Sequence, residues 1–261
     1  MSDTSLTQNT REYYDRIGRD LGTSYEYERW FKGIIQKSHY NHTRKSIEWA
    51  IRDNFGAVER CLEIGCGVGT WTDLFLQCSD HMSIVDISEE LLNVVKEKYK
   101  NKNKVDYMCC DFIEKDLPLL DSFDAIFSIR ALEYMSDKRM MAKRCYDYLR
   151  ENGKVVIITK NPLWRDKTID NRKKVTNHHN EEKGNDIQTG WIPWKDLRSI
   201  FLECNFRDVR IYPVAMGSYY RPYNNLIGTK ACDFIHGIMY KRHMRGIMNN
   251  LTESYLLVGK K

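Results

Sequence analysis

The chain has 261 residues, and its 42% hydrophobic content with six tryptophans supplies enough apolar surface for a buried core, which excludes a disordered protein. A formal net charge of +5 permits an anionic partner, but it lacks the basic balance typical of a nucleic-acid reader. The polar first residues contain no apolar signal segment, and no window has the length of a membrane span, so we expect a cytoplasmic protein.

Eight cysteines are spread along the chain, and none of them forms a Cys-x-x-Cys pair. In a chain with this much apolar material, the pattern predicts reduced core residues rather than a disulfide framework or a zinc site. We therefore expect no bound metal.

An aromatic-rich segment from Thr10 to Ile51 comes first in chain order and includes Tyr14 and Tyr27. Its isoleucines recur at the spacing of a helix face with charged residues between them. The segment therefore predicts two helices that pack beside a sheet.

A glycine-rich turn follows within the stretch from Val58 to Trp71. A short apolar strand ends at Ile64, Gly65 begins a turn with glycine at every second position, and a helix begins near Thr70. Glycines let the backbone adopt positive φ and let a ligand approach the chain closely, and the first turn of a helix favours polar or anionic ligand groups. This order of elements predicts a nucleotide-binding loop.

The spacing of the glycines distinguishes between nucleotides. A dinucleotide fingerprint, G-x-G-x-x-G, requires glycine at position 70, which is Thr70, whereas the third glycine is Gly69. A carboxylate, Glu63, precedes the loop, where it would repel a pyrophosphate and hold a cation. The stretch resembles motif I of the class I S-adenosylmethionine-dependent methyltransferases. The resemblance implies S-adenosyl-L-methionine as the co-substrate.

Three further strand ends carry side chains in the order that this family shows. Asp86 follows an apolar run and lies 86 − 65 = 21 residues after the first glycine, where it can accept the ribose hydroxyls. Asp111 and Phe112 occupy the position where the resemblance places an adenine contact, and Ile129 leads into the segment that lines the methyl-donor cleft. The cofactor-binding residues predicted from the motifs and the resemblance are Tyr14, Glu63, Gly65, Cys66, Gly67, Gly69, Asp86, Ile87, Asp111, Phe112, Ile129 and Arg130.

The candidates for acid-base chemistry are Glu133, Tyr27 and the loop histidines His178 and His179. Glu133 follows the fourth strand, at the edge where open α/β sheets bind ligands, and its apolar neighbours favour a raised pKa. The alternative is that Glu133 caps or pairs at the start of the next helix.

The second half of the chain continues the strand and helix alternation and contains two interruptions. The stretch 165–190 is almost free of apolar residues and predicts a mobile active-site loop or a disordered excursion. The stretch 216–251 mixes aromatic and basic residues and predicts a helical cap insertion over the acceptor pocket before the last strand. An alternative for the insertion is a basic amphipathic surface that meets a membrane or a lipid-linked acceptor.

The alternation and the resemblance together predict an α/β fold, with a Rossmann-like, mostly parallel seven-stranded sheet and helices on both faces. The segment from Tyr27 to Trp30 also resembles the start of the ubiquinone- and menaquinone-type branch, which implies that residues 1–51 form an N-terminal helical lid and residues 52–261 the methyltransferase domain.

The resemblance implies methyl transfer to an oxygen or nitrogen of a small molecule, such as a quinone, lipid or sugar. Two alternatives stay open, an RNA methyltransferase and a catalytically inactive module that binds S-adenosylmethionine. Nucleic acid is the less favoured partner because the basic clusters are short. The sequence carries no signal of oligomeric state.

Overall fold

The computed structural model describes residues 3–118, 120–162, 176–180, 185–215, 230, 234, 238, 245–250 and 252–261. The helices of the described chain are α1 (Asp3–Leu21), α2 (Ser24–Trp30), α3 (Ile34–Asn54), α4 (Thr72–Cys78), α5 (Glu89–Lys98), the 3₁₀ turn η1 (Leu132–Tyr134), α6 (Lys138–Tyr148), α7 (Trp194–Glu203) and α9 (Arg245–Met248). The strands are β1 (Val58–Ile64), β2 (Ser79–Asp86), β3 (Val105–Cys109), β4 (Phe123–Ile129), β5 (Leu149–Lys160), β6 (Thr176–Asn180), β7 (Asn185–Thr189), β8 (Arg207–Ala215) and β9 (Ser254–Lys260).

Seven strands form one sheet in the order β3-β2-β1-β4-β5-β9-β8. The pairs from β3 to β5 are parallel, and β9 is antiparallel to both β5 and β8. Reversal of β9 leaves β8 pointing the same way as β1 to β5, so six of the strands share one direction. This confirms the predicted mostly parallel α/β sheet.

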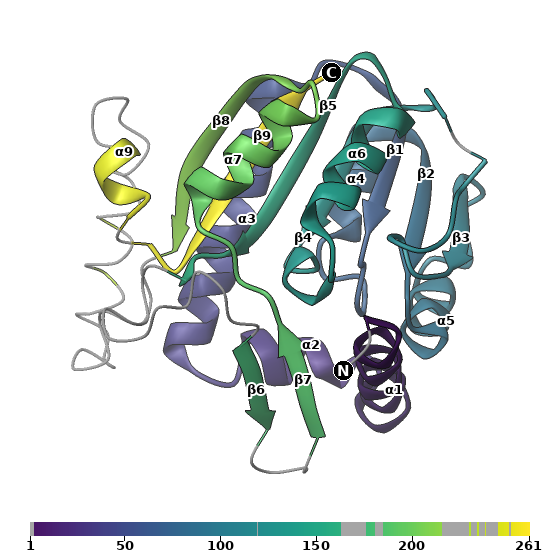
Figure 1. The fold of residues 1–261 in the computed structure, drawn as a ribbon. Helices are drawn as coiled ribbons and strands as arrows, with labels where there is room; N and C mark the ends of the chain where they lie inside the picture. The colour runs from purple at the N-terminus through teal and green to yellow at the C-terminus, as the bar shows by residue number, and fades with distance from the viewer. Residues whose placement is uncertain are drawn as a thin grey trace.

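Helices cover both faces of the sheet, as Figure 1 shows, with α6 and α7 on one face and α3 and α4 on the other. On the α3 and α4 face, the rings of Phe75 and Phe127 stack at 4.1 Å between centroids. On the α6 and α7 face, Phe201 and Tyr255 are fully buried. The central strands are therefore apolar on both sides, which is the usual condition of a parallel sheet.

The N-terminal segment forms three helices rather than the predicted two. Gly22 ends α1 with a φ of +48°, and its N–H donates to the Gly18 carbonyl at 3.1 Å, which closes the helix in the left-handed conformation that glycine tolerates. The break creates the short helix α2 before α3 begins at Ile34. In Figure 1, α1 and α2 lie beside the carboxyl ends of the parallel strands.

Both predicted interruptions lie partly outside the described residues. Within 165–190, the described strands β6 and β7 pair antiparallel. Within 216–251, α9 is described, and most of the predicted cap lies outside the described residues. No helix in the described part of the chain is long and apolar enough to cross a membrane.

Candidate active site

A cavity opens at the carboxyl ends of β1, β2, β3 and β4 and extends to α1 and α2. The sheet supplies Gly65, Cys66, Gly67, Asp86, Ile87, Asp111, Phe112, Ile129 and Arg130. The helical side supplies Thr7, Thr10, Tyr14, Tyr25, Arg29 and Trp30. With Tyr14 and the nine residues of the sheet side, ten of the twelve predicted cofactor-binding residues line one cavity. Glu63 and Gly69 do not line it.

The glycine loop has the backbone shape that the sequence pattern predicts. Gly65 has a φ of +76°, and a Cβ added there would lie 2.3 Å from the Cβ of Ala131. Gly67 has a φ of +56° with open space beside it, and Gly69 has a φ of +75°. Side chains are therefore excluded at Gly65 by contact and are strained at all three positions, which keeps the loop bare beside the cavity.

Asp86 fixes this loop from the end of β2. Its Oδ2 accepts a hydrogen bond from the Gly67 N–H at 3.1 Å, and its Oδ1 accepts from the Ser88 N–H at 3.0 Å. Burial raises the pKa of Asp86, while the N–H donors of Ser88 and Gly67 oppose that rise. The carboxylate is 7% exposed and lines the cavity.

Asp111 and Phe112 follow β3. Asp111 accepts from the Ile113 N–H at 2.6 Å, which turns the chain after the strand. Phe112 is buried and meets Tyr148 edge-to-face with 5.9 Å between ring centroids. Both residues line the cavity beside Asp86, as the convergence of parallel strand ends requires.

Glu63 lies beneath the loop instead of facing the cavity. Its Oε2 accepts a hydrogen bond from the Thr72 hydroxyl at 2.7 Å, which links β1 to α4. Burial raises its pKa to about 8, with the Thr72 hydrogen bond opposing the shift. The carboxyl is therefore mainly protonated at neutral pH.

Glu133 forms a buried ion pair with Arg130. The Arg130 Nε donates to Glu133 Oε1 at 2.8 Å, and the Thr159 hydroxyl donates to Glu133 Oε2 at 2.9 Å. Burial favours the neutral acid, but the Arg130 guanidinium outweighs it and lowers the pKa of Glu133. The expectation of a raised pKa was wrong, because a partner three residues away could not be oriented from the sequence. The alternative, pairing near the start of the next helix, describes the observed contact.

Tyrosines line the helical side of the cavity. The Tyr14 ring on α1 meets Tyr134 edge-to-face at 5.3 Å between centroids. Burial raises the pKa of Tyr25 on α2 to about 12 and also raises the pKa of Tyr134. These hydroxyls are therefore neutral at physiological pH. Tyr27, by contrast, is 60% exposed and does not line the cavity.

Sequence reasoning missed Tyr25 and Arg29, and it included Tyr134 only as the last residue of the segment expected to line the methyl-donor cleft. Tyr25 and Arg29 are four residues apart, so they share one face of α2, and both line the cavity. The spacing could have indicated that the two side chains point the same way. The sequence does not show that they point into the cavity, because the direction of α2 depends on the break at Gly22.

A second buried charged group lies at the ends of β5 and β9. The Lys160 ammonium pairs with Glu253 Oε1 at 3.2 Å, and His39 Nε2 on α3 lies 3.8 Å from Glu253 Oε2. Burial lowers the pKa of His39 to about 4, so the imidazole is neutral at pH 7. Among the described residues, no three His, Cys, Asp or Glu side chains gather as a metal site.

Residues 61–153 match the family described as "Methyltransferase domain". The chain is 28% identical over 116 residues to the ubiquinone biosynthesis O-methyltransferase of Aromatoleum aromaticum, covering 44% of this chain and 50% of that protein. It is also 28% identical over 156 residues to phosphoethanolamine N-methyltransferase 1 of Arabidopsis thaliana, covering 56% of this chain and 28% of the relative. The chain thus spans half or less of these curated relatives.

Solved structures share the fold at low identity. The N-methyltransferase NodS of Bradyrhizobium japonicum, in complex with S-adenosyl-L-homocysteine, has a TM-score of 0.61 and 13% identity, covering 97% of this chain and 98% of that chain. The [4+2]-cyclase SpnF has a TM-score of 0.64 and 14% identity, covering 97% and 94%. The family match covers the glycine loop and the strands that follow it, so residues 61–153 match a methyltransferase domain, and the chain shares the fold of these solved structures.

Proposed function

We propose that the chain transfers a methyl group from S-adenosylmethionine to an oxygen or nitrogen of a small molecule. One observation carries the proposal: a bare glycine loop and two strand-end carboxylates, Asp86 and Asp111, line the same cavity as the tyrosines of α1 and α2. The sheet side has the hydrogen-bond acceptors that an adenosine needs, and the helical side leaves an aromatic wall for the reacting end.

The donor contacts follow from the geometry of each side chain. Asp86 accepts the ribose hydroxyls as charge-assisted hydrogen bonds, because its carboxylate lines the cavity at the end of β2. Asp111 accepts the adenine amino group, and the Phe112 ring lies against the base. Glu63 supports the glycine loop and does not contact the donor, because its carboxyl accepts the hydrogen bond of the Thr72 hydroxyl.

The sulfonium of the donor already activates the methyl group, so the chain's own work is alignment and exclusion of water. Tyr14 and Tyr25 close the helical side of the cavity with ring surface, and their hydroxyls remain neutral. Glu133 is occupied by Arg130 and Thr159 and holds the end of β4 in place. We therefore assign Glu133 to positioning, and we assign no residue as a general base.

The test is incubation of the protein with methyl-labelled S-adenosylmethionine and a metabolite extract, followed by separation of labelled products. The proposal expects labelled small molecules, with a lower yield for Asp86→Ala than for the wild type at limiting donor concentration. A total RNA sample treated in parallel examines the RNA alternative. If the label is found in RNA alone, the methyl acceptor is RNA and not a small molecule. Donor binding without any labelled product would favour the inactive module, a reading that the cyclase on the same fold keeps open.

A further inference from the structure

The charges that line the cavity are distributed unevenly between its two ends. Asp86 and Asp111 lie at the sheet end, and both accept backbone N–H donors. Arg130 and Glu133 neutralise each other. Arg29 is the remaining charged side chain among the described lining residues, and it comes from α2 on the helical side. The cavity therefore has an acidic end and a basic end.

Arg29 has no carboxylate partner in the described part of the chain. Its guanidinium instead lies over the Trp30 ring, with the carbon 4.9 Å from the ring centroid. Trp30 is 6% exposed and is held edge-to-face by Trp71 at 5.4 Å, so the platform beneath the guanidinium is rigid. Stacking uses the face of the guanidinium and leaves the N–H donors along its edge available to a ligand.

Tyr25 lies one turn before Arg29 on the same helix and lines the same cavity. Burial raises its pKa to about 12 in spite of the neighbouring guanidinium, so the phenol keeps its proton and can donate a hydrogen bond. A planar cation on an aromatic support, next to a neutral hydroxyl donor, suits a planar or tetrahedral oxyanion better than a neutral ligand.

We infer that Arg29 binds an oxyanion, a carboxylate or phosphate group, carried by a ligand of this cavity. Two sources share this chemistry: the carboxylate of the methyl donor and an acidic group on the methyl acceptor. The inference rests on the proposed function for both sources, although anion binding by Arg29 can be measured without any methyl transfer.

The experiment compares the full-length protein with Arg29→Gln, which removes the charge, and Arg29→Lys, which keeps the charge but loses the planar fork. Arg44→Gln is the matched control, because Arg44 lies on α3 in an exposed pair with Glu48 and does not line the cavity. Calorimetry in an anion-free buffer measures S-adenosylhomocysteine, 5′-methylthioadenosine (which lacks the carboxylate), inorganic phosphate and malonate.

The donor source predicts that Arg29→Gln loses about tenfold or more in affinity for S-adenosylhomocysteine and keeps wild-type affinity for 5′-methylthioadenosine, with Arg29→Lys between the two. The acceptor source predicts unchanged nucleoside binding. In that case, phosphate or malonate binds to the wild-type protein saturated with S-adenosylhomocysteine and fails to bind Arg29→Gln.

Two results would overturn the inference. In the first, Arg29→Gln has the same affinity as the wild type and Arg44→Gln for every ligand. In the second, Arg29→Gln loses affinity for both nucleosides equally, which indicates disturbed packing around Trp30. If the wild type binds neither nucleoside, the proposed function fails instead. The phosphate and malonate titrations on the free protein then still decide whether Arg29 binds an anion.

Discussion

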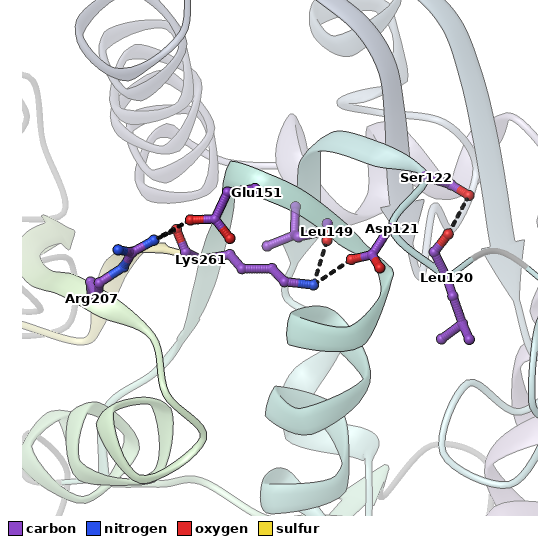
Figure 2. A network of polar contacts seen from close by, with 7 residues as sticks. All are labelled: Leu120, Asp121, Ser122, Leu149, Glu151, Arg207 and Lys261. Atoms are coloured by element: carbon purple, nitrogen blue, oxygen red, sulfur yellow. Dashed lines mark hydrogen bonds and ion pairs between the residues drawn. The ribbon is translucent and has the colours of Figure 1, made fainter.

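The parallel strands begin at one end of the sheet, the amino edge, and finish at the other, the carboxyl edge. Every ion pair named at the amino edge has at least one exposed partner, since Asp121 is 69% exposed although Lys261 is 12% exposed, whereas both partners of the Arg130–Glu133 pair at the carboxyl edge are largely buried. At the amino edge, shown in Figure 2, the Lys261 ammonium pairs with Asp121 at 2.5 Å and donates to the Leu149 carbonyl, and Arg207 pairs with Glu151 at 2.6 Å. Arg207 and Glu151 are 62% and 68% exposed. At the carboxyl edge, the Arg130–Glu133 pair is almost fully buried and Arg29 lacks a carboxylate partner among the described residues.

This difference separates charges that stabilise the surface from charges that form a site. Exposed pairs contribute little because water screens them, so the amino edge can carry many without cost. A buried charge is expensive and persists only with a partner or a function. The carboxyl edge is therefore where ligand binding is expected, in agreement with the general position of sites in open α/β sheets.

The largest predicted effect is the loss of stability when the buried ion pair of Arg130 and Glu133 is broken. Glu133→Gln leaves the Arg130 guanidinium buried without a charge partner, so we expect the free energy of unfolding to fall by about 3 kcal/mol or more. Denaturant unfolding measures this. Glu151→Gln, the matched change at the amino edge, should cost less than about 1 kcal/mol. Equal costs for the two variants would contradict the distinction between the edges.

The next effect concerns Asp86. Asp86→Ala should weaken binding of S-adenosylmethionine by about 1.5–3 kcal/mol, because it removes the charge-assisted acceptor at the ribose position, while the fold survives. Calorimetry measures the affinity. Asp121→Ala, which removes a carboxylate from the amino edge, should leave it unchanged. Wild-type affinity in Asp86→Ala would refute the donor contact.

Glu63 gives a dependence of stability on pH. Its pKa in the folded state is about 8 and its ordinary value is 4.5, so between these pH values the folded protein holds a proton that the unfolded chain releases. The stabilisation is fully present below pH 4.5 and decreases as the pH rises to 8, by at most about 1.4 kcal/mol per pH unit. Glu63→Gln should flatten this slope in unfolding measurements across the window. An unchanged slope would mean that Glu63 is ionised in the folded state.

The smallest effect concerns the contact between α1 and α5. Asp15 Oδ1 accepts a hydrogen bond at 2.6 Å from the hydroxyl of Ser88, which lies two residues after Asp86 in the chain. Asp15→Ala should reduce stability by about 1 kcal/mol and increase amide exchange in α1, measured by hydrogen exchange. Arg19→Ala, which breaks an exposed pair with Glu90 on the same helices, is the control and should change neither. Matching exchange rates in the two variants would show that Asp15 does not fasten α1.

The parts of the site that the sequence predicted depend on chain order. Asp86, Asp111 and Ile129 each follow an apolar strand, and parallel strands bring their carboxyl ends to one edge whatever the helices do. Gly65 was predictable because a strand-to-helix turn with this shape excludes a Cβ. The seven-stranded sheet followed from the same alternation.

The remaining parts depend on directions that no local pattern encodes. The side chain of Glu63 turns toward Thr72 because α4 packs against β1, and the sequence gives no sign of which side of the loop the carboxyl occupies. Glu133 meets Arg130 because Arg130 adopts a φ of +64° and turns the chain sharply after β4. The α2 face that carries Arg29 is set by the turn at Gly22.

The most direct test of the central claim is a calorimetric titration of the wild-type protein with S-adenosylmethionine and, separately, with NAD. The glycine spacing predicts saturable binding of S-adenosylmethionine at one site and at least tenfold weaker binding of NAD, because Thr70 stands where the dinucleotide fingerprint requires its third glycine. Tighter binding of NAD, or no binding of S-adenosylmethionine, would contradict the account.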